Sequence, residues 1–225
     1  MILQARLFNI LKSTSYCDAI IKKTYKNRVE YTICNSFVEG LEYDNKKSSE
    51  EEVVRVSTSR IKSKIKDYCE CNNFEYFFTQ TLIENRDDLE TFKKNIQKKF
   101  KAYKRINKNF IYLIIFEKHK DGCYHLHGVV GGLGSDVYIN DNFYLSLKFF
   151  EDLGYNSLSR IKNIFKISNY ITKYITKDLI KTESGYSYFH SKNLNVPIRE
   201  KVKYIPVNAE LIFENDYIKK WVVKK

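Results

Sequence analysis

The sequence has few residues that interrupt or divide a chain, with two prolines among its 225 residues. A long linker, an internal repeat and a low-complexity tract are also missing. These absences argue against a string of small domains and predict one substantial domain with an extension. The polar, charged stretch 44–52 is the best candidate for a flexible loop or a boundary. We therefore expect an N-terminal extension over residues 1–56, packed on the core, and a main domain over residues 57–225.

Long apolar runs are missing as well. The sequence contains no stretch of the roughly 18 apolar residues that a membrane-spanning helix needs. It begins Met-Ile-Leu-Gln-Ala-Arg, which does not have the pattern of a signal peptide. The sequence therefore predicts a cytoplasmic protein without a membrane partner.

The cysteines are few, odd in number and irregularly spaced. They are Cys17, Cys34, Cys69, Cys71 and Cys123. A reduced cytoplasmic protein fits this usage. The pair Cys69 and Cys71 could join Cys17 and Cys34 in a zinc site, but no Cys-x-x-Cys pair occurs, which argues against one.

Positive charge and aromatic residues are abundant. The formal net charge is +12, and the sequence contains 18 tyrosines and 15 phenylalanines. An excess of this size predicts a polyanionic partner, most simply nucleic acid, although solubility alone is the simpler explanation of the charge. Aromatic side chains that are not part of the core can stack on bases.

The hydrophobic pattern predicts an α+β fold. We expect helices over residues 57–71, 87–104, 144–153 and 168–181, strands over 74–83, 111–117, 124–130 and 160–165, and a β-rich tail over 201–223 that extends the sheet. The core order is β-α-β-β-α-β, the ferredoxin-like arrangement of an antiparallel sheet with helices on one face. The hairpin then supplies central strands, and its histidines lie on the open face of the sheet.

Two histidines lie on the second strand of the predicted hairpin. His125 and His127 follow the turn signal Asp121-Gly122, and side chains at i and i+2 of a strand share a face. Glu117, at the end of the first strand, can return across the hairpin to the same face. Two imidazoles and a carboxylate with positions left open suit a catalytic Mg²⁺, Mn²⁺ or Zn²⁺ better than a closed structural site.

Two tyrosines are spaced by one helical turn. Tyr170 and Tyr174 occupy i and i+4, which on a helix lie about 6 Å apart on one face. Lys173 and Lys177 each follow a tyrosine by three residues, so an ammonium group could hold phosphate or stabilise a phenolate. The simpler alternative is an amphipathic helix with two half-buried tyrosines. That alternative explains the repeat poorly, because Ile171, Ile175 and Leu179 already supply an apolar stripe.

Three motifs together resemble the HUH-type rolling-circle replication initiators, the Rep proteins of small plasmids, phages and single-stranded DNA viruses. They stand in the family's order over residues 57–197, as Phe77-Phe78-Thr79-Gln80-Thr81-Leu82, His125-Leu126-His127 and Tyr170 to Lys177. The resemblance implies that His125, His127 and Glu117 bind Mg²⁺ or Mn²⁺. It also implies that Tyr170 and Tyr174 are nucleophiles, supported by Lys173 and Lys177, that nick single-stranded or hairpin origin DNA through a 5′-phosphotyrosine.

Other functions stay open at this point. A transposase or a mobilisation relaxase would use the same site on a different DNA, and a ferredoxin-like sheet could be a non-catalytic nucleic-acid-binding module. A histidine-triad hydrolase is disfavoured because Val129 stands where that family has a third histidine. The sequence lacks the P-loop motif of a helicase, so an initiator would rely on a host helicase and DNA polymerase. His119 and His190 are expected to be exposed loop residues rather than ligands.

Overall fold

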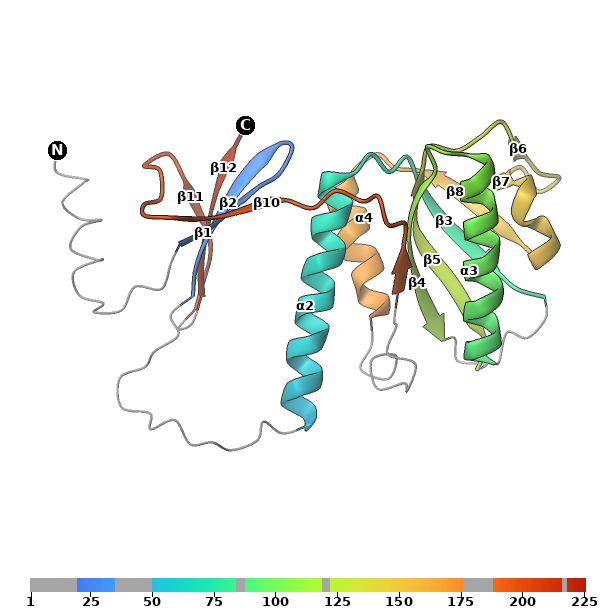
Figure 1. Cartoon of the computed structure of the whole chain (residues 1–225), viewed down its shortest axis with the longest axis horizontal. Coiled ribbons are helices and arrows are strands. Elements are labelled where there is room, and N and C mark those ends of the chain that lie inside the picture. The colour runs from blue at the N-terminus through green and yellow to red at the C-terminus, as the bar shows by residue number, and fades with distance from the viewer. Residues whose placement is uncertain (1–19, 35–49, 84–87, 119–121, 176–187, 216–217) are drawn as a thin grey trace. The chain divides into compact units, whose positions relative to one another are not determined.

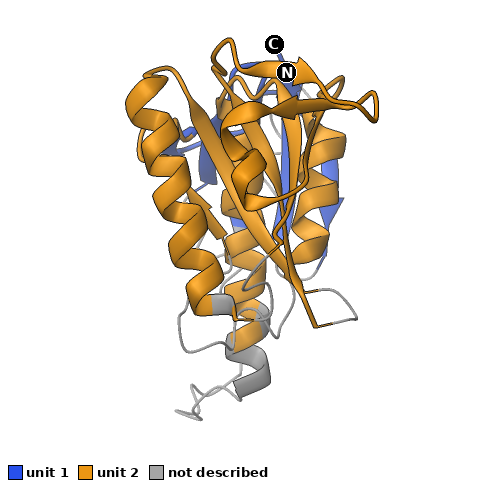
Figure 2. Ribbon diagram, turned by 90° about the vertical axis from the view of Figure 1, so that its right-hand side faces the viewer, with its two compact units in different colours: residues 1–47, 197–225 blue, residues 48–196 orange. Residues whose placement is uncertain are grey.

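The structure is a computed structural model that describes residues 20–34, 50–83, 88–118, 122–175, 188–215 and 218–225. The chain divides into two compact units, coloured separately in Figure 2. Unit 1 comprises residues 1–47 and 197–225, and unit 2 comprises residues 48–196. The C-terminal residues therefore group with the N-terminal ones. The division into an extension over residues 1–56 and a main domain over residues 57–225 stays a prediction.

Unit 2 is built around an antiparallel sheet with the strand order β6-β7-β8-β3-β5-β4-β9. The strands are β3 (Tyr76–Thr81), β4 (Ile111–Lys118), β5 (Tyr124–Gly131), β6 (Val137–Ile139), β7 (Leu145–Leu147), β8 (Asn156–Arg160) and β9 (Tyr188–His190). The predicted hairpin is confirmed as β4 and β5, and both strands lie inside the sheet with a neighbour on each side.

Helix α3 (Leu89–Ile106) covers one face of this sheet. Its apolar residues recur about once a turn, and the carboxylate of Asp88 caps the N-terminus by accepting hydrogen bonds from the amides of Glu90 and Thr91, at 3.0 and 3.3 Å. Phe92, Ile96, Phe100 and Tyr103 pack on the side chains of alternate strand positions, including Phe78, Ile114, Phe116 and Leu126. The 3₁₀ helix η1 (Lys148–Leu153) adds Phe150 to the same core.

Two further α-helices cover the opposite face. These are α2 (Glu50–Cys71) and α4 (Ile164–Ile171), which continues into the 3₁₀ helix η2 (Thr172–Tyr174). Ile65 of α2 and Ile171 of α4 pack with Ile115 and Val129 of the sheet in a second core. Figure 1 shows α3 on one side of the sheet and α2 with α4 on the other. Within the predicted core order, α3 and η1 pack on one face; α2 and α4, which precede and follow that order, cover the other, because β4 and β5 carry large apolar side chains on both faces and both must be covered.

Several predicted boundaries were also wrong. Residues 144–153 do not form one helix: β7 is held beside β8 by the Asn156 side chain, which accepts a hydrogen bond from the Leu147 amide at 2.7 Å, and η1 follows. The strand predicted over 160–165 lies earlier, as β8. The tyrosine helix begins at Ile164 because Asn163, rather than Ser168, caps it. Helix α2 begins at Glu50, inside the stretch predicted to be a loop.

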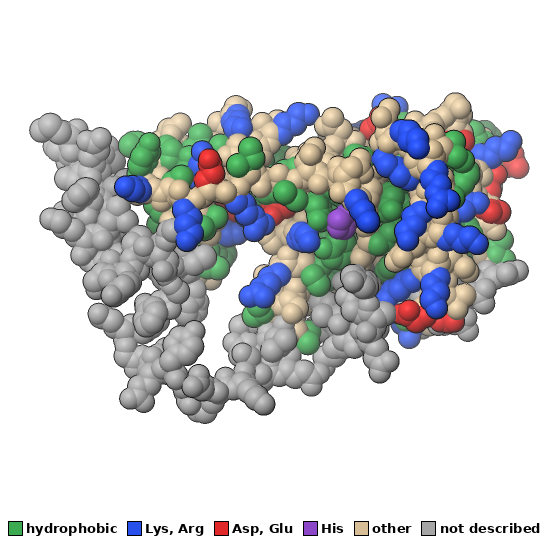
Figure 3. Space-filling view, viewed as in Figure 1, with side chains coloured by type: hydrophobic (Ala, Val, Ile, Leu, Met, Phe, Trp, Pro, Cys, Tyr) green, Lys and Arg blue, Asp and Glu red, His purple; other side chains and the backbone are tan. Residues whose placement is uncertain are grey.

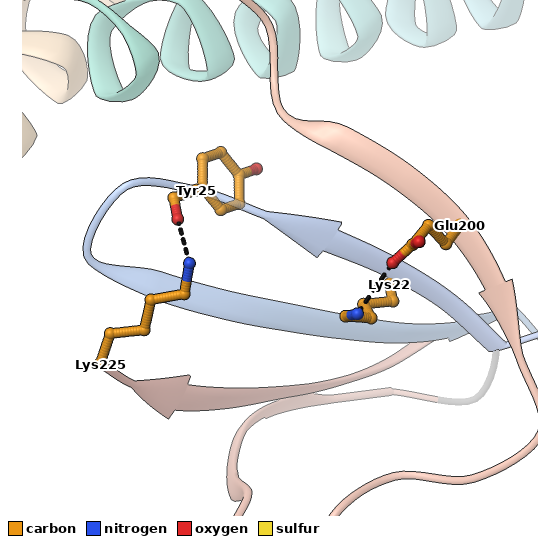
Figure 4. A network of polar contacts seen from close by, with 4 residues as sticks. All are labelled: Lys22, Tyr25, Glu200 and Lys225. Atoms are coloured by element: carbon orange, nitrogen blue, oxygen red, sulfur yellow. Dashed lines mark hydrogen bonds and ion pairs between the residues drawn. The ribbon is translucent and has the colours of Figure 1, made fainter.

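Unit 1 is a second antiparallel sheet with the order β10-β1-β2-β12-β11. Its strands are β1 (Ile20–Thr24), β2 (Arg28–Cys34), β10 (Ile198–Val202), β11 (Glu210–Glu214) and β12 (Ile218–Lys224). Figure 4 shows two contacts between its N-terminal and C-terminal segments: Lys22 Nζ pairs with Glu200 at 2.8 Å, and Lys225 Nζ donates to the Tyr25 carbonyl at 3.0 Å. The prediction that the tail extends the main sheet was wrong, because its strands pair with β1 and β2.

Helices able to cross a membrane are not found in the parts of the chain that the structure describes. The thiol of Cys69 is buried in the core around α2, and burial raises its pKa far above the ordinary value. Cys17 lies outside the described residues.

Candidate functional site

Three neighbouring strands carry the first part of the site in two rows. In the first row Thr81 of β3 lies opposite His125 of β5, which lies opposite Glu117 of β4. In the next row Thr79 lies opposite His127. Directly opposite residues in an antiparallel sheet point to the same face, so both histidines and the carboxylate share the face that α2 and α4 partly cover. This register brings His125, His127 and Glu117 to one face, as predicted.

His127 is in direct contact with Glu117. The distance from His127 Nε2 to Glu117 Oε2 is 2.6 Å, and the two side chains are 12% and 27% exposed. The other ring nitrogen, Nδ1, lies 3.3 Å from the Thr79 hydroxyl. His125 has a matching contact, with Nδ1 3.1 Å from the Thr81 hydroxyl. Each imidazole is thus held on its Nδ1 side by a threonine of β3.

One of the two tyrosines contacts a histidine of the sheet, and the other contacts the first tyrosine. The ring of Tyr174 stacks on that of His127 with centroids 4.4 Å apart and planes 13° apart. The ring of Tyr170 meets that of Tyr174 edge to face at 5.3 Å, and it also contacts Phe77 of β3 at 5.5 Å. Tyr170 lies in α4 and Tyr174 in η2. The two rings are in contact although the helix changes from α to 3₁₀ between them. Tyr170 is 43% exposed.

The surroundings of Tyr174 keep its hydroxyl protonated. Burial raises the pKa of Tyr174, and a hydrogen bond with Tyr170 together with the charge of Glu117 raises it further. Ionisation of this phenol at neutral pH would require a positive charge that offsets these effects.

One of the two predicted lysines can be placed. Lys173 is exposed, and its Nζ lies 5.9 Å from the centre of the Tyr170 ring, in the geometry of a cation–π contact. Lys177 lies outside the described residues.

The donor atoms suit a divalent cation in chemistry, since imidazole nitrogens and a carboxylate bind Mn²⁺ and Mg²⁺. Among the described residues, no group of three His, Cys, Asp or Glu side chains is gathered closely enough to hold a metal ion. His127 and Glu117 hydrogen-bond to each other instead. A cation between them would replace this bond, and His125, which lies opposite Glu117 on β5, could then supply the third donor.

Thr79, Thr81 and Phe77 belong to the first sequence motif, but the sequence did not predict a role for them. The signal that could have shown their place is the spacing, because two threonines at i and i+2 match two histidines at i and i+2 on the paired strand. The prediction for His190 was wrong: it lies half-buried in β9, with Nε2 3.3 Å from the Tyr68 hydroxyl, because β9 pairs with β4. His119 lies outside the described residues.

Comparison with known families gives one match. Residues 75–179, just under half of the chain, match the family of replication-associated proteins named after ORF2 and the phage gene 2 protein. This segment runs from β3 through η2 and includes the histidines, Glu117 and both tyrosines. Neither the curated proteins nor the solved structures include one that matches the chain. The family match indicates a role associated with DNA replication.

Proposed function

We propose that this protein is an HUH-type rolling-circle replication initiator. It nicks and rejoins single-stranded or hairpin origin DNA through a covalent 5′-phosphotyrosine, with Mg²⁺ or Mn²⁺ as cofactor and with a host helicase and DNA polymerase as partners. The observation that carries the proposal is the contact of Tyr174 with His127 beside Glu117. Through this contact Tyr174, the proposed nucleophile, lies beside His127 and Glu117, the proposed metal ligands, although it is distant from them in the sequence.

The topology of unit 2 supports this proposal. Its inner strands have the order β8-β3-β5-β4, which is the order 4-1-3-2 of a ferredoxin-like core. The connections that include α3 and η1 bury apolar side chains on the same face, as in that fold. The opposite face, where α4 carries the tyrosines, is then the reactive one.

The charge of the chain also supports a DNA substrate. The net charge is +12, and Figure 3 shows lysine and arginine side chains gathered over the region of α3. Because α3 covers the sheet face opposite the tyrosines, this charge would attract DNA to the protein rather than hold it at the site. Positive charge of this kind supplies contacts to phosphates that do not depend on base sequence.

His127, Glu117 and His125 are the residues that would hold the cation. Bound there, it would supply Lewis-acid polarisation of a phosphate oxygen and favour the phenolate. The positive charge of the cation would offset the burial and the negative charge that raise the pKa of Tyr174.

The tyrosine hydroxyl performs the covalent step. The Tyr174 oxygen attacks phosphorus, the bond from phosphorus to the 3′ oxygen breaks, and the phenolic proton is lost. The departing 3′ oxygen takes up a proton and becomes the free 3′-OH, which would prime DNA synthesis. Tyr170, which contacts Tyr174 and is 43% exposed, would attack in a second strand transfer while Tyr174 is occupied. Lys173 and Lys177 would contact phosphate beside them.

A transposase or relaxase would use these same residues and differs in its DNA substrate. A non-catalytic nucleic-acid-binding module is the second candidate, and the observation that favours it is the ring of Tyr170, which is 43% exposed and contacts Phe77 beside the histidines. In that case the aromatic rings beside the histidines would stack on bases and no covalent product would form.

A covalent-adduct assay tests the proposal. The protein is incubated with a pool of single-stranded oligonucleotides and Mn²⁺, and protein-DNA adducts that survive SDS are measured. We expect adducts from the native protein, no adducts with EDTA, and a loss of at least about 100-fold for His127→Ala or His125→Ala with DNA affinity retained, because affinity comes from phosphate contacts. Glu117→Ala should cause a smaller but large loss.

His190→Ala is the matched control, since His190 is also a half-buried histidine of this sheet, and its ring contacts Tyr68 and Tyr188, which the proposal gives no role. It should form adducts at the native level. Native protein that binds DNA yet forms no adduct under any of these conditions would establish the binding module instead.

A further inference from the structure

Each histidine of the site is paired with one threonine, and the two pairs repeat the same geometry. Thr79 lies directly opposite His127 and Thr81 directly opposite His125 in the register of β3 and β5. The distances from threonine hydroxyl to histidine Nδ1 are 3.3 and 3.1 Å. In both pairs the contact involves Nδ1, and in His127 the other ring nitrogen, Nε2, contacts Glu117.

A simple explanation is that threonine is common on strands and happens to lie beside a polar neighbour. The repetition argues against it. Two threonines at i and i+2 meet two histidines at i and i+2, and both contacts involve the same ring nitrogen. For His127 the other nitrogen, Nε2, contacts Glu117 at 2.6 Å, so the ring is held from both sides.

We propose that Thr79 and Thr81 are positioning residues that orient His127 and His125, the two histidines that would hold the cation. The proposal rests on the proposed function, because it names the residues that support the donor set of that same site. A ligand histidine normally donates its other ring N–H to a neighbouring acceptor, and loss of that acceptor weakens metal binding.

A hydroxyl is suited to this role because it both donates and accepts. When His127 Nε2–H donates to Glu117, Nδ1 is unprotonated and accepts a hydrogen bond from the Thr79 O–H. When Nε2 binds a cation, Nδ1 carries the proton and donates to the same oxygen. The threonine therefore keeps the ring in one orientation through the change of tautomer, which a carboxylate, an acceptor only, would not do.

Mn²⁺ binding by the full chain without DNA tests the proposal. Free Mn²⁺ is measured by electron paramagnetic resonance for the native protein, Thr79→Val, Thr81→Val, Thr79→Ser and Thr81→Ser. Valine keeps the branched shape and strand preference of threonine, whereas serine keeps the hydroxyl. We expect each valine variant to weaken Mn²⁺ binding by about 10- to 100-fold and each serine variant to stay near native.

Thr32→Val is the matched control. Thr32 is a half-buried threonine on β2 of the other sheet, so its replacement should leave Mn²⁺ affinity unchanged. Ring ¹⁵N chemical shifts of the metal-free protein supply a readout besides metal binding. They should report a changed tautomer balance of His127 in Thr79→Val and of His125 in Thr81→Val, with native values in the serine variants.

The outcomes separate this proposal from the proposed function. Native affinity and unchanged ring shifts in both valine variants, while the native protein binds Mn²⁺ and forms adducts, would overturn the positioning role alone. A native protein that neither binds Mn²⁺ nor forms adducts would overturn the proposed function and this role with it. A loss in the serine variants as large as in the valine variants would attribute the effect to packing and also overturn the role.

Discussion

At the scale of single residues, the two tyrosines differ in their surroundings. Tyr174 stacks on His127 and has a raised pKa, whereas Tyr170 stands at the outer side with 43% of its surface exposed. We propose that Tyr174, the tyrosine nearer the donor set, attacks first, because attack requires the hydroxyl close to the polarised phosphate. The more exposed one can reach a second strand.

We expect Tyr174→Phe to remove most of the covalent adduct in a single-turnover nicking assay, because phenylalanine keeps the ring contacts and removes the attacking oxygen. Tyr170→Phe should retain the first nick and impair the later strand transfer. The double variant should form no adduct. DNA found by mass spectrometry on any other residue would contradict the assignment of these tyrosines as nucleophiles.

At the scale of elements, strand β5 carries the histidines and also needs a glycine. A Cβ at Gly128 would collide with the Leu113 carbonyl oxygen and approach Ile114 Cα to 2.9 Å. Both are atoms of the neighbouring β4 backbone, which cannot move aside as a flexible side chain would. The glycine that follows the histidine motif is therefore explained by the close approach of two central strands rather than by chemistry.

Gly128→Ala should destabilise unit 2 by about 1–3 kcal/mol or more, because overpacking of this size shifts the backbone of β4 and β5. Chemical denaturation measures the change. Gly122→Ala is the comparison: it meets open space and is strained by a φ of +86°, so it should cost about 1–2 kcal/mol. A Gly128→Ala protein as stable as the native one would show that β4 and β5 can separate without cost.

At the scale of the whole molecule, the described parts of the two units have cores of different size. In the described residues, the two core clusters of unit 2 contain sixteen and nine buried residues, and the cluster of unit 1 contains three. Stability that comes from buried apolar surface is therefore concentrated in unit 2.

Hydrogen exchange should follow this difference. Amides of β2 should exchange faster than those of β5, although both are inner strands of their sheets, because opening unit 1 exposes less apolar surface. Exchange measured by mass spectrometry on the full chain checks this expectation. Equal protection of β2 and β5 would mean that the two units unfold as one.

Alkaline pH should destabilise unit 2. Burial raises the pKa of Tyr103, Tyr112 and Tyr188, and the bond that Tyr103 donates to Asp136 adds to its shift. A raised pKa in the folded state gives stability that is complete below the unfolded pKa of about 10 and is lost as pH rises above it. The free energy of unfolding should therefore fall above about pH 10, less steeply in Tyr103→Phe, while the exposed Tyr144→Phe should leave the loss unchanged.

The sequence alone determined much of unit 2, because local spacing carries the information. The turn signal and alternation of residues 111–130 determined the β4–β5 hairpin, and period-2 geometry placed His125 and His127 on one face. The periodic apolar residues and Asp88 determined α3. The i, i+4 spacing predicted that Tyr170 and Tyr174 meet, as they do.

Tertiary structure decided the rest, because it depends on pairings between distant segments. Pairing of β1 with β10 and of β2 with β12 drew the tail into a separate sheet, a choice that strand propensity cannot make. Packing decided that α2 and α4 cover the face with the histidines, and β9 brought His190 out of its expected loop. The register of β3 on β5 set the two threonines against the two histidines, since a shift of one residue would turn them to the opposite face.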